Sequence, residues 1–178
     1  RASDGEPEGV LHDAAARLVT IHIPLVSDAE LARALEIVGR ELVELGIVAV
    51  HDPGALAPDP GLAFSFPAYA YLSDAGRLPV RVHACLRDDA LDTAIAGGLR
   101  SGDVLGADPF GRARIGWQKC FADGSMGSRT ARLLEDIEPE PVRPLPPDQR
   151  RGLWMTEPAV LEGLVGRAAA GGIATQTP

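Results

Sequence analysis

Lysine is almost absent from this 178-residue chain, since Lys119 is the one lysine among 17 basic residues. An arginine-rich sequence that keeps a single lysine favours a role that arginine cannot fill. A lysine amine can lose its proton when buried, act as a nucleophile and react with carbon dioxide to form a carbamate, whereas a guanidinium stays charged. Lys119 is therefore the first candidate functional residue. The alternative is a lysine that occurs there by chance.

Long apolar runs and cysteines are also scarce. No stretch reaches the ~18 apolar residues of a membrane-spanning helix. Cys85 and Cys120 are the two cysteines and form no recognisable motif, so we expect a reduced, cytoplasmic protein rather than a disulfide scaffold. The chain begins at Arg1 without a Met or a signal pattern, and we expect it to come from a longer reading frame.

Positive charge is in deficit, with a net charge of −8 and a pI of about 4.9. A general nucleic-acid binder needs a basic surface, and an anionic membrane attracts basic segments. We therefore expect neither partner. Hydrophobic residues make up 46% of the sequence, which is enough for the core of one globular domain.

Helical and strand patterns alternate along the chain. Ser27 and Asp28 form an N-cap before an apolar stripe at three- and four-residue spacing, which ends at Gly46. The apolar run 47–50 that follows is typical of a buried parallel strand. The same alternation predicts helices at 66–75, 88–99 and 157–170, and strands at 79–86, 115–121 and 173–176.

Helix–strand repeats at this spacing predict βα units and a parallel sheet. The fold class that we expect is α/β, a partial (β/α) TIM-like barrel of about four parallel strands with intervening helices. A closed barrel needs eight strands and ~250 residues, so residues 1–178 would form its central part, with both ends of the full domain missing. A small, complete open α/β domain is the alternative. The proline-containing segments 55–67 and 138–147 are expected to be loops.

Three polar residues lie at or near the carboxyl ends of predicted strands, where parallel α/β folds gather their chemistry: His51, His83 and Lys119. A histidine in such a place is more often a packed barrel residue than a ligand, and we expect neither histidine to bind metal. The glycine-containing loop 123–130 follows the Lys119 strand. Such a loop can present backbone N–H groups to a substrate, but it lacks the Gly-Lys-Ser/Thr ending of a Walker A motif.

The segment 117–131 reads WQKCFADGSMGSRTA. It resembles the signature of metal-dependent amidohydrolase family 3, the YtcJ-like branch of the amidohydrolase superfamily, in which the pattern is Lys-x-Phe-Ala-Asp-Gly-Ser-x-Gly-Ser-Arg-Thr-Ala. Three other segments are similar to family segments in the same order: 4–11 (DGEPEGVL), 46–53 (GIVAVHDP) and 170–176 (AGGIATQ). The resemblance covers nearly the whole chain.

The resemblance implies a TIM-like barrel with one or two divalent metal ions, zinc by preference, at its mouth. It implies hydrolysis of C–N bonds other than peptide bonds, as in amides or cyclic amides, by metal-activated water. Lys119 is then the position of a carboxylated lysine that bridges two metals. We also expect Asp123 and Arg129 to bind the small-molecule substrate, with roles in holding the loop as the alternative.

The chain departs from the family pattern in its other metal ligands. The family's His-x-His pair, its later histidine and its catalytic aspartate have no counterpart here, and the chain ends at 176–178 where the family supplies a histidine. Metal sites usually have three or four protein ligands. We therefore expect most ligands to lie outside this chain, which on its own would be inactive and holds no assigned catalytic residue. The alternative function is a non-catalytic barrel remnant that binds a partner or self-associates, as a homo-oligomer, through its sheet edges.

Overall fold

The computed structural model describes residues 9, 11, 15, 17–24, 26–54, 65–87, 90–138, 145 and 147–178. The chain divides into two compact units. The sheet unit comprises Leu25–Phe121 and Glu157–Pro178, and the loop unit comprises Arg1–Pro24 and Ala122–Thr156. The expectations for 4–8, 55–64, 88–89 and most of 138–147 lie outside the described residues.

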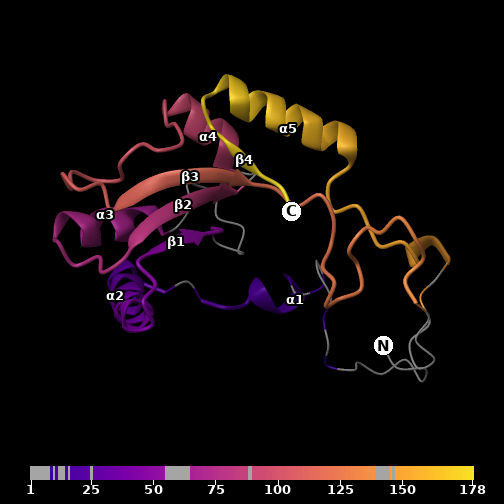
Figure 1. Ribbon diagram of the computed structural model, residues 1–178, viewed down its shortest axis with the longest axis horizontal. Coiled ribbons are helices and arrows are strands. Elements are labelled where there is room, and N and C mark those ends of the chain that lie inside the picture. The colour runs from indigo at the N-terminus through magenta and orange to yellow at the C-terminus, as the bar shows by residue number, and fades with distance from the viewer. Residues whose placement is uncertain are drawn as a thin grey trace. The chain divides into compact units, whose positions relative to one another are not determined.

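The sheet unit is built on four parallel strands in the order β1-β2-β3-β4. Sequence neighbours are therefore also neighbours in the sheet, and the sheet curves as it passes from β1 to β4 (Figure 1). This sequential parallel order confirms the predicted part of a (β/α) barrel. The strands are β1 (Ala49–Asp52), β2 (Arg81–Arg87), β3 (Ala113–Lys119) and β4 (Thr175–Gln176).

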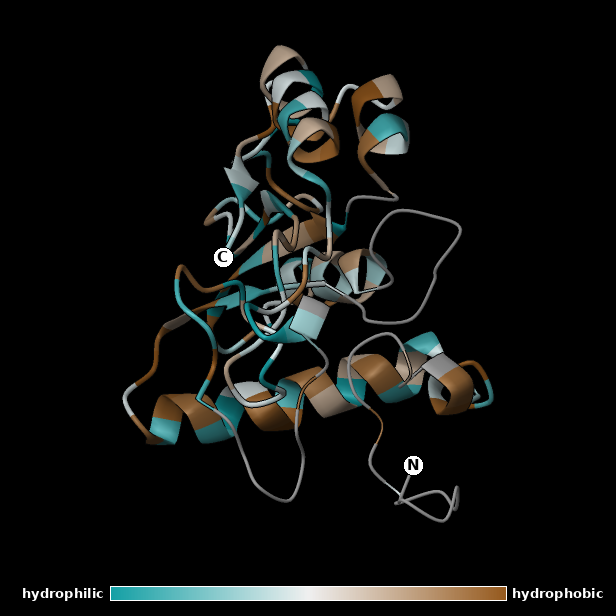
Figure 2. Ribbon diagram, turned by 90° about the vertical axis from the view of Figure 1, so that its right-hand side faces the viewer, coloured by the Kyte–Doolittle hydropathy of each residue, from teal (hydrophilic) through white to brown (hydrophobic). Residues whose placement is uncertain are grey.

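Helices alternate with the strands as predicted: α2 (Asp28–Glu44), α3 (Phe66–Asp74), α4 (Leu91–Ala96) and α5 (Pro158–Ala170). Helix α2 begins with a capping box, in which Ser27 Oγ accepts from Glu30 N at 3.3 Å and Glu30 Oε2 accepts from Ser27 N at 2.9 Å. Polar and apolar residues alternate along α2 (Figure 2). Helices α4 and α5 lie side by side near β3 and β4 (Figure 1), and Arg167 pairs with Asp92 across them.

The hydrophobic core lies between these helices and one face of the sheet. Alternate residues of β2 contribute to it, because side chains along a strand point to opposite faces in turn. The largest fully buried apolar side chains in the core come from α3, β2, α4, β3 and the segment between α5 and β4: Leu72, Leu86, Leu91, Ile115 and Ile173.

Among the boundaries that differ from the prediction, the start of β1 and the end of α4 have the same cause, a backbone hydrogen bond that closes the end of a helix. Ile47 was expected in a strand, but its N–H donates to Leu42 O at 2.9 Å and so closes the end of α2. Strand β1 therefore starts two residues later and includes His51. Helix α4 ends at Ala96 rather than at residue 99, because Leu99 N donates back to Ala94 O at 3.0 Å around Gly98, whose φ is +72°.

The loop unit contains two short helical segments that the patterns did not predict, α1 (Arg17–Thr20) and η3 (Pro147–Gln149). The segment that follows β3 pairs with the segment that precedes α5 through backbone hydrogen bonds. Leu153 N donates to Thr130 O and Met155 N donates to Ala122 O, each at 2.9 Å. These bonds hold the ends of the excursion between β3 and α5 together.

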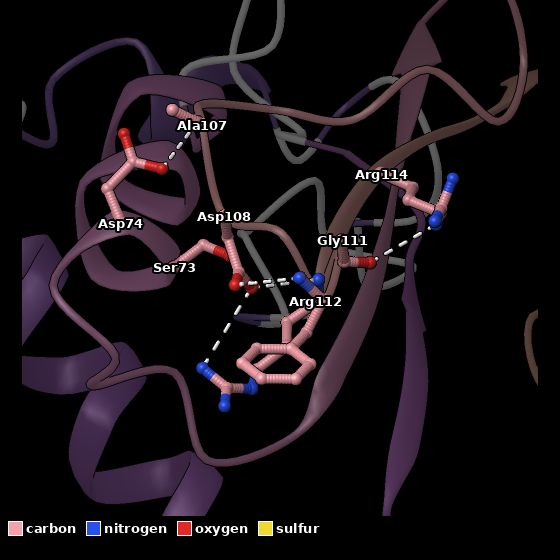
Figure 3. Close-up of polar contacts among 8 residues, drawn as sticks. Ser73, Asp74, Ala107, Asp108, Gly111, Arg112 and Arg114 are labelled. Atoms are coloured by element: carbon pink, nitrogen blue, oxygen red, sulfur yellow. Dashed lines mark hydrogen bonds and ion pairs between the residues drawn. The ribbon is translucent and has the colours of Figure 1, made fainter.

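A buried carboxylate ties α3 to the segment that enters β3. Asp108 Oδ2 accepts from Ser73 Oγ at 2.8 Å and from Arg112 N at 3.1 Å, and Oδ1 accepts from Phe110 N at 3.1 Å (Figure 3). Burial alone would raise the pKa of Asp108, but these hydrogen bonds outweigh it and hold the pKa below its usual value.

Asp108→Asn should therefore lower the urea midpoint of unfolding at pH 7, because an amide cannot accept all three hydrogen bonds. Since the folded-state pKa of Asp108 is lowered, the contribution of the carboxylate is present above its unfolded pKa and is lost as the pH falls through the folded one. The difference from wild type should shrink below about pH 4. Urea unfolding at pH 7 and pH 3 measures this, with the exposed Asp92→Asn as control. Equal midpoints at pH 7 would contradict the assignment.

Candidate functional site

The sheet face opposite the core carries the predicted site residue of this unit. Up to Ile115, β3 alternates in step with β2, and Ala84 pairs with Ile115. The next pair is Leu86 with Gln118, so β3 has one residue more than β2 at this point. This β-bulge puts Gln118 on the core face and Lys119 on the opposite face.

Lys119 is the last residue of β3 and lies at the carboxyl end of the sheet, as predicted. It is only 8% exposed, and its Nζ lies 4.8 Å from the centre of the Phe121 ring. Its register partner on β2 is Arg87, whose Cζ lies 5.0 Å from the centre of the same ring. Two cations at the ends of neighbouring strands thus share one aromatic side chain.

Neither cation forms an ion pair with a carboxylate of the described residues. The Nη1 atom of Arg87 is buried and has no hydrogen-bond acceptor among the residues that the structure describes. Buried cations in proteins are normally paired. The described part of the site therefore has an excess of positive charge. The motif analysis missed Arg87, although it ends a predicted strand as Lys119 does, and the same positional rule would have found it.

The two strand histidines pack among aromatic rings. His51 stacks on Trp117 with ring centres 4.2 Å apart and an interplanar angle of 7°, and it meets His83 edge-on at 4.9 Å. Burial, followed by the charges of His51, Arg114 and Arg81, lowers the pKa of His83 and favours its neutral form. This packing agrees with the interpretation of both histidines as barrel residues.

The described residues include no group of three or more histidine, cysteine, aspartate or glutamate side chains that could hold a metal ion. Lys119 is buried at the carboxyl end of the sheet, and its role as a metal ligand stays a prediction. Cys120 belongs to the core, facing away from Lys119 as expected, and burial raises the pKa of the Cys85 thiol. No disulfide joins Cys85 and Cys120.

Asp123 and Arg129 lie in the loop unit, where both hold the loop. Asp123 Oδ2 accepts from Arg132 N at 2.6 Å. Arg129 has a φ of +59°, in the left-handed region, and its guanidinium donates to Glu138 O. These contacts supply the structural alternative for both residues, and their substrate-binding roles stay predictions.

The serine and threonine side chains of the motif bond to one another. Ser128 Oγ lies 2.8 Å from Ser125 Oγ and 2.7 Å from Thr130 Oγ1. Thr130 Oγ1 also accepts from Ser125 N at 3.1 Å, while Thr130 N and Ala131 N donate to Ser125 O at 3.0 and 3.1 Å. These three N–H groups are therefore used inside the loop rather than presented to a ligand.

Comparison with known proteins identifies the family. Residues 1–176 match the sequence model of the Amidohydrolase family, and the chain therefore belongs to it. The chain is 28% identical over 139 residues to a protein of Bacillus subtilis (strain 168) named "Putative amidohydrolase YtcJ", and this match covers 78% of the chain and 25% of that protein. The resemblance inferred from segment 117–131 is thus confirmed.

Two solved structures share the fold. They are uncharacterized metal-dependent hydrolases from Pyrococcus horikoshii OT3 (TM-score 0.69, 23% identity) and Pyrococcus furiosus (TM-score 0.68, 24% identity). Each match covers 92% of this chain but only 30% and 31% of the solved chains. The chain thus spans less than a third of the length of these relatives. Among the described residues, no helix is long and apolar enough to cross a membrane.

The packing of the motif loop predicts different effects for its two glycines. A Cβ added at Gly124 would lie 2.0 Å from Thr130 Oγ1 and 2.8 Å from its backbone carbon, whereas a Cβ at Gly127 would meet nothing within 4 Å. Gly124→Ala should therefore displace Thr130 and destabilise the protein by ~1–3 kcal/mol, while Gly127→Ala should have almost no effect. Thermal unfolding of both variants checks this. Equal stabilities would show that the loop can adjust around a Cβ at residue 124.

Proposed function

We propose that this chain is the central part of a metal-dependent amidohydrolase barrel that hydrolyses C–N bonds of amides or cyclic amides, other than peptide bonds, with metal-activated water. Membership of the amidohydrolase family supports the reaction class. The observation that carries the proposal is the placement of Lys119. The sole lysine of the chain is buried at the carboxyl end of β3, on the face opposite the core, and no carboxylate of the described residues pairs with it.

Lys119 would hold metal as its carbamate, which offers two hard oxygen atoms. Bound zinc, as one or two ions, would supply a water with a pKa of ~7 and would polarise the substrate carbonyl. The Phe121 ring lies beside the Lys119 amine, and the lysine is buried. Asp123 and Arg129 enter the proposal as substrate-binding residues, through the loop that they hold.

The remaining ligands would come from outside residues 1–178. The histidines of β1 and β2 pack with Trp117, and no described cluster completes a metal site. The chain matches 25% of the length of YtcJ, so the rest of such a protein offers ample room for those ligands. The 178 residues by themselves are then inactive. A cytoplasmic location belongs to the same proposal, supported by the two buried cysteines, which no disulfide joins.

The rival proposal is a non-catalytic binding or self-association module. It is supported by the positions of β1 and β4 at the two ends of the described strand order. This module would associate in a concentration-dependent way and would show no metal-dependent turnover.

Lys119→Ala in the full-length protein should reduce the zinc content and lower kcat/KM for amide hydrolysis by more than ~100-fold, since even outer-shell partners of metals contribute 10–100-fold. Metal analysis and a panel of amides and cyclic amides measure both quantities, with Gly127→Ala as a control in the same motif. Propionate should restore part of the activity, because its carboxylate replaces the two carbamate oxygens. Unchanged metal content and activity in Lys119→Ala would refute the role of Lys119.

A further inference from the structure

Arg87 and Lys119 occupy equivalent places on neighbouring strands. Each ends its strand, the two are register partners, and both approach the Phe121 ring. Adjacent strands lie about 4.8 Å apart, so the two side chains leave the backbone from adjoining points on the same face. A group attached to the end of one side chain is therefore within reach of the other.

The Arg87 side chain is held from two directions. Gly54, which follows β1, lies against its stem, since a Cβ on Gly54 would be 3.2 Å from both Cγ and Cδ of Arg87. The φ of Gly54 is +86°, a conformation that suits glycine. The guanidinium at the other end lies against Phe121. Arg87 is thus oriented before any ligand arrives.

The carboxylate at the end of the neighbouring strand β1 is already in use. Asp52, at the end of β1, accepts from Gly54 N at 2.9 Å, from Ser65 Oγ at 3.0 Å and from Tyr69 OH at 3.0 Å. Burial, followed by the charge of Asp52, raises the pKa of Tyr69, so its hydroxyl stays protonated and donates. Asp52 therefore fixes the start of α3 rather than neutralising Arg87.

The missing partner of Arg87 is a negative group with a free oxygen. Within the described part of the chain its buried Nη1 has no acceptor, and the adjacent Lys119 adds a second positive charge instead of compensating the first. An aromatic face offsets only part of the cost of burying a cation. A planar carboxylate-like group would supply the missing acceptor and would compensate the positive charge, because a guanidinium donates to such a group with matched geometry.

Carboxylation of Lys119 creates such a group in place. The neutral amine attacks the carbon of carbon dioxide, an N–C bond forms, one C=O electron pair moves onto oxygen, and the proton of the amine leaves to solvent. The product carries one negative charge on two oxygen atoms. The pair of like charges at the Phe121 ring becomes a pair of opposite charges.

We propose that Arg87 is a positioning residue that stabilises the carbamate of Lys119 by donating a hydrogen bond from its buried Nη1. This inference rests on the proposed function, in which Lys119 is carboxylated. It adds a second residue of this chain to the site, one that acts through Lys119 and has no metal contact of its own.

The test measures carbamate directly. The metal-free full-length protein is incubated with ¹³C-bicarbonate, and the carbamate is quantified by ¹³C NMR and by the added mass of one carbon dioxide in native mass spectrometry. Arg87→Gln should reduce carbamate occupancy at limiting bicarbonate by about 10-fold, and higher bicarbonate should restore it by mass action. Arg81→Gln, an exposed arginine on the same strand, should leave occupancy unchanged, and Lys119→Arg should abolish it.

Equal occupancy in Arg87→Gln and wild type would overturn the inference and leave the proposed function standing. No carbamate in wild type would overturn both the inference and the carboxylation of Lys119. Zinc content and amide hydrolysis on the same sample would then show separately whether the hydrolase proposal fails. Arg87→Lys keeps the positive charge and the aliphatic stem, so it replaces Arg87→Gln in this test if Arg87→Gln does not fold. Its carbamate occupancy is expected to lie between that of wild type and the reduced value given for Arg87→Gln.

Discussion

One additional residue in β3 determines the chemistry of this sheet. Side chains alternate between faces with a period of two, so an unbroken β3 would place Lys119 on the face of Ile115, within the core. The bulge opposite Cys85 changes that parity. Gly116 allows it, because a Cβ there would lie 3.1 Å from Cys85 Sγ. Lys119 lies on the face opposite the core only because the regular pairing of β2 and β3 is interrupted before this residue.

The same bulge places Gln118 on the core face, where its side-chain nitrogen and oxygen are buried without partners among the described residues. An unpaired buried amide is unfavourable. A regular strand with an apolar residue at 118 would pack better but would reverse the direction of residue 119. Stability of the core and placement of the lysine therefore oppose each other at two adjacent positions.

Local signals were enough to predict most elements. The Ser27 cap and the glycines that follow α2 and α3 act through neighbours in sequence, and the structure places them as predicted. The bulge and the isolation of Arg87 depend on contacts between strands, which no single-strand pattern contains. The motif 117–131 revealed the family, yet hydrogen bonds specific to the folded loop explain why it contains Gly124 and Thr130.

The net charge of the chain does not predict the charge of its candidate site. The chain has a net charge of −8, from which a preference for cations would follow. The sheet face opposite the core has the reverse character, because β2 and β3 place only basic groups among its charged side chains: Arg81, Arg87, Arg114 and Lys119. Neighbouring carboxylates such as Asp52 and Asp108 are turned toward α3 and hold its two ends. These two acids serve the structure, while Arg87 and Lys119 lie at the carboxyl ends of their strands without a carboxylate partner among the described residues, where an anionic group gains the most from them.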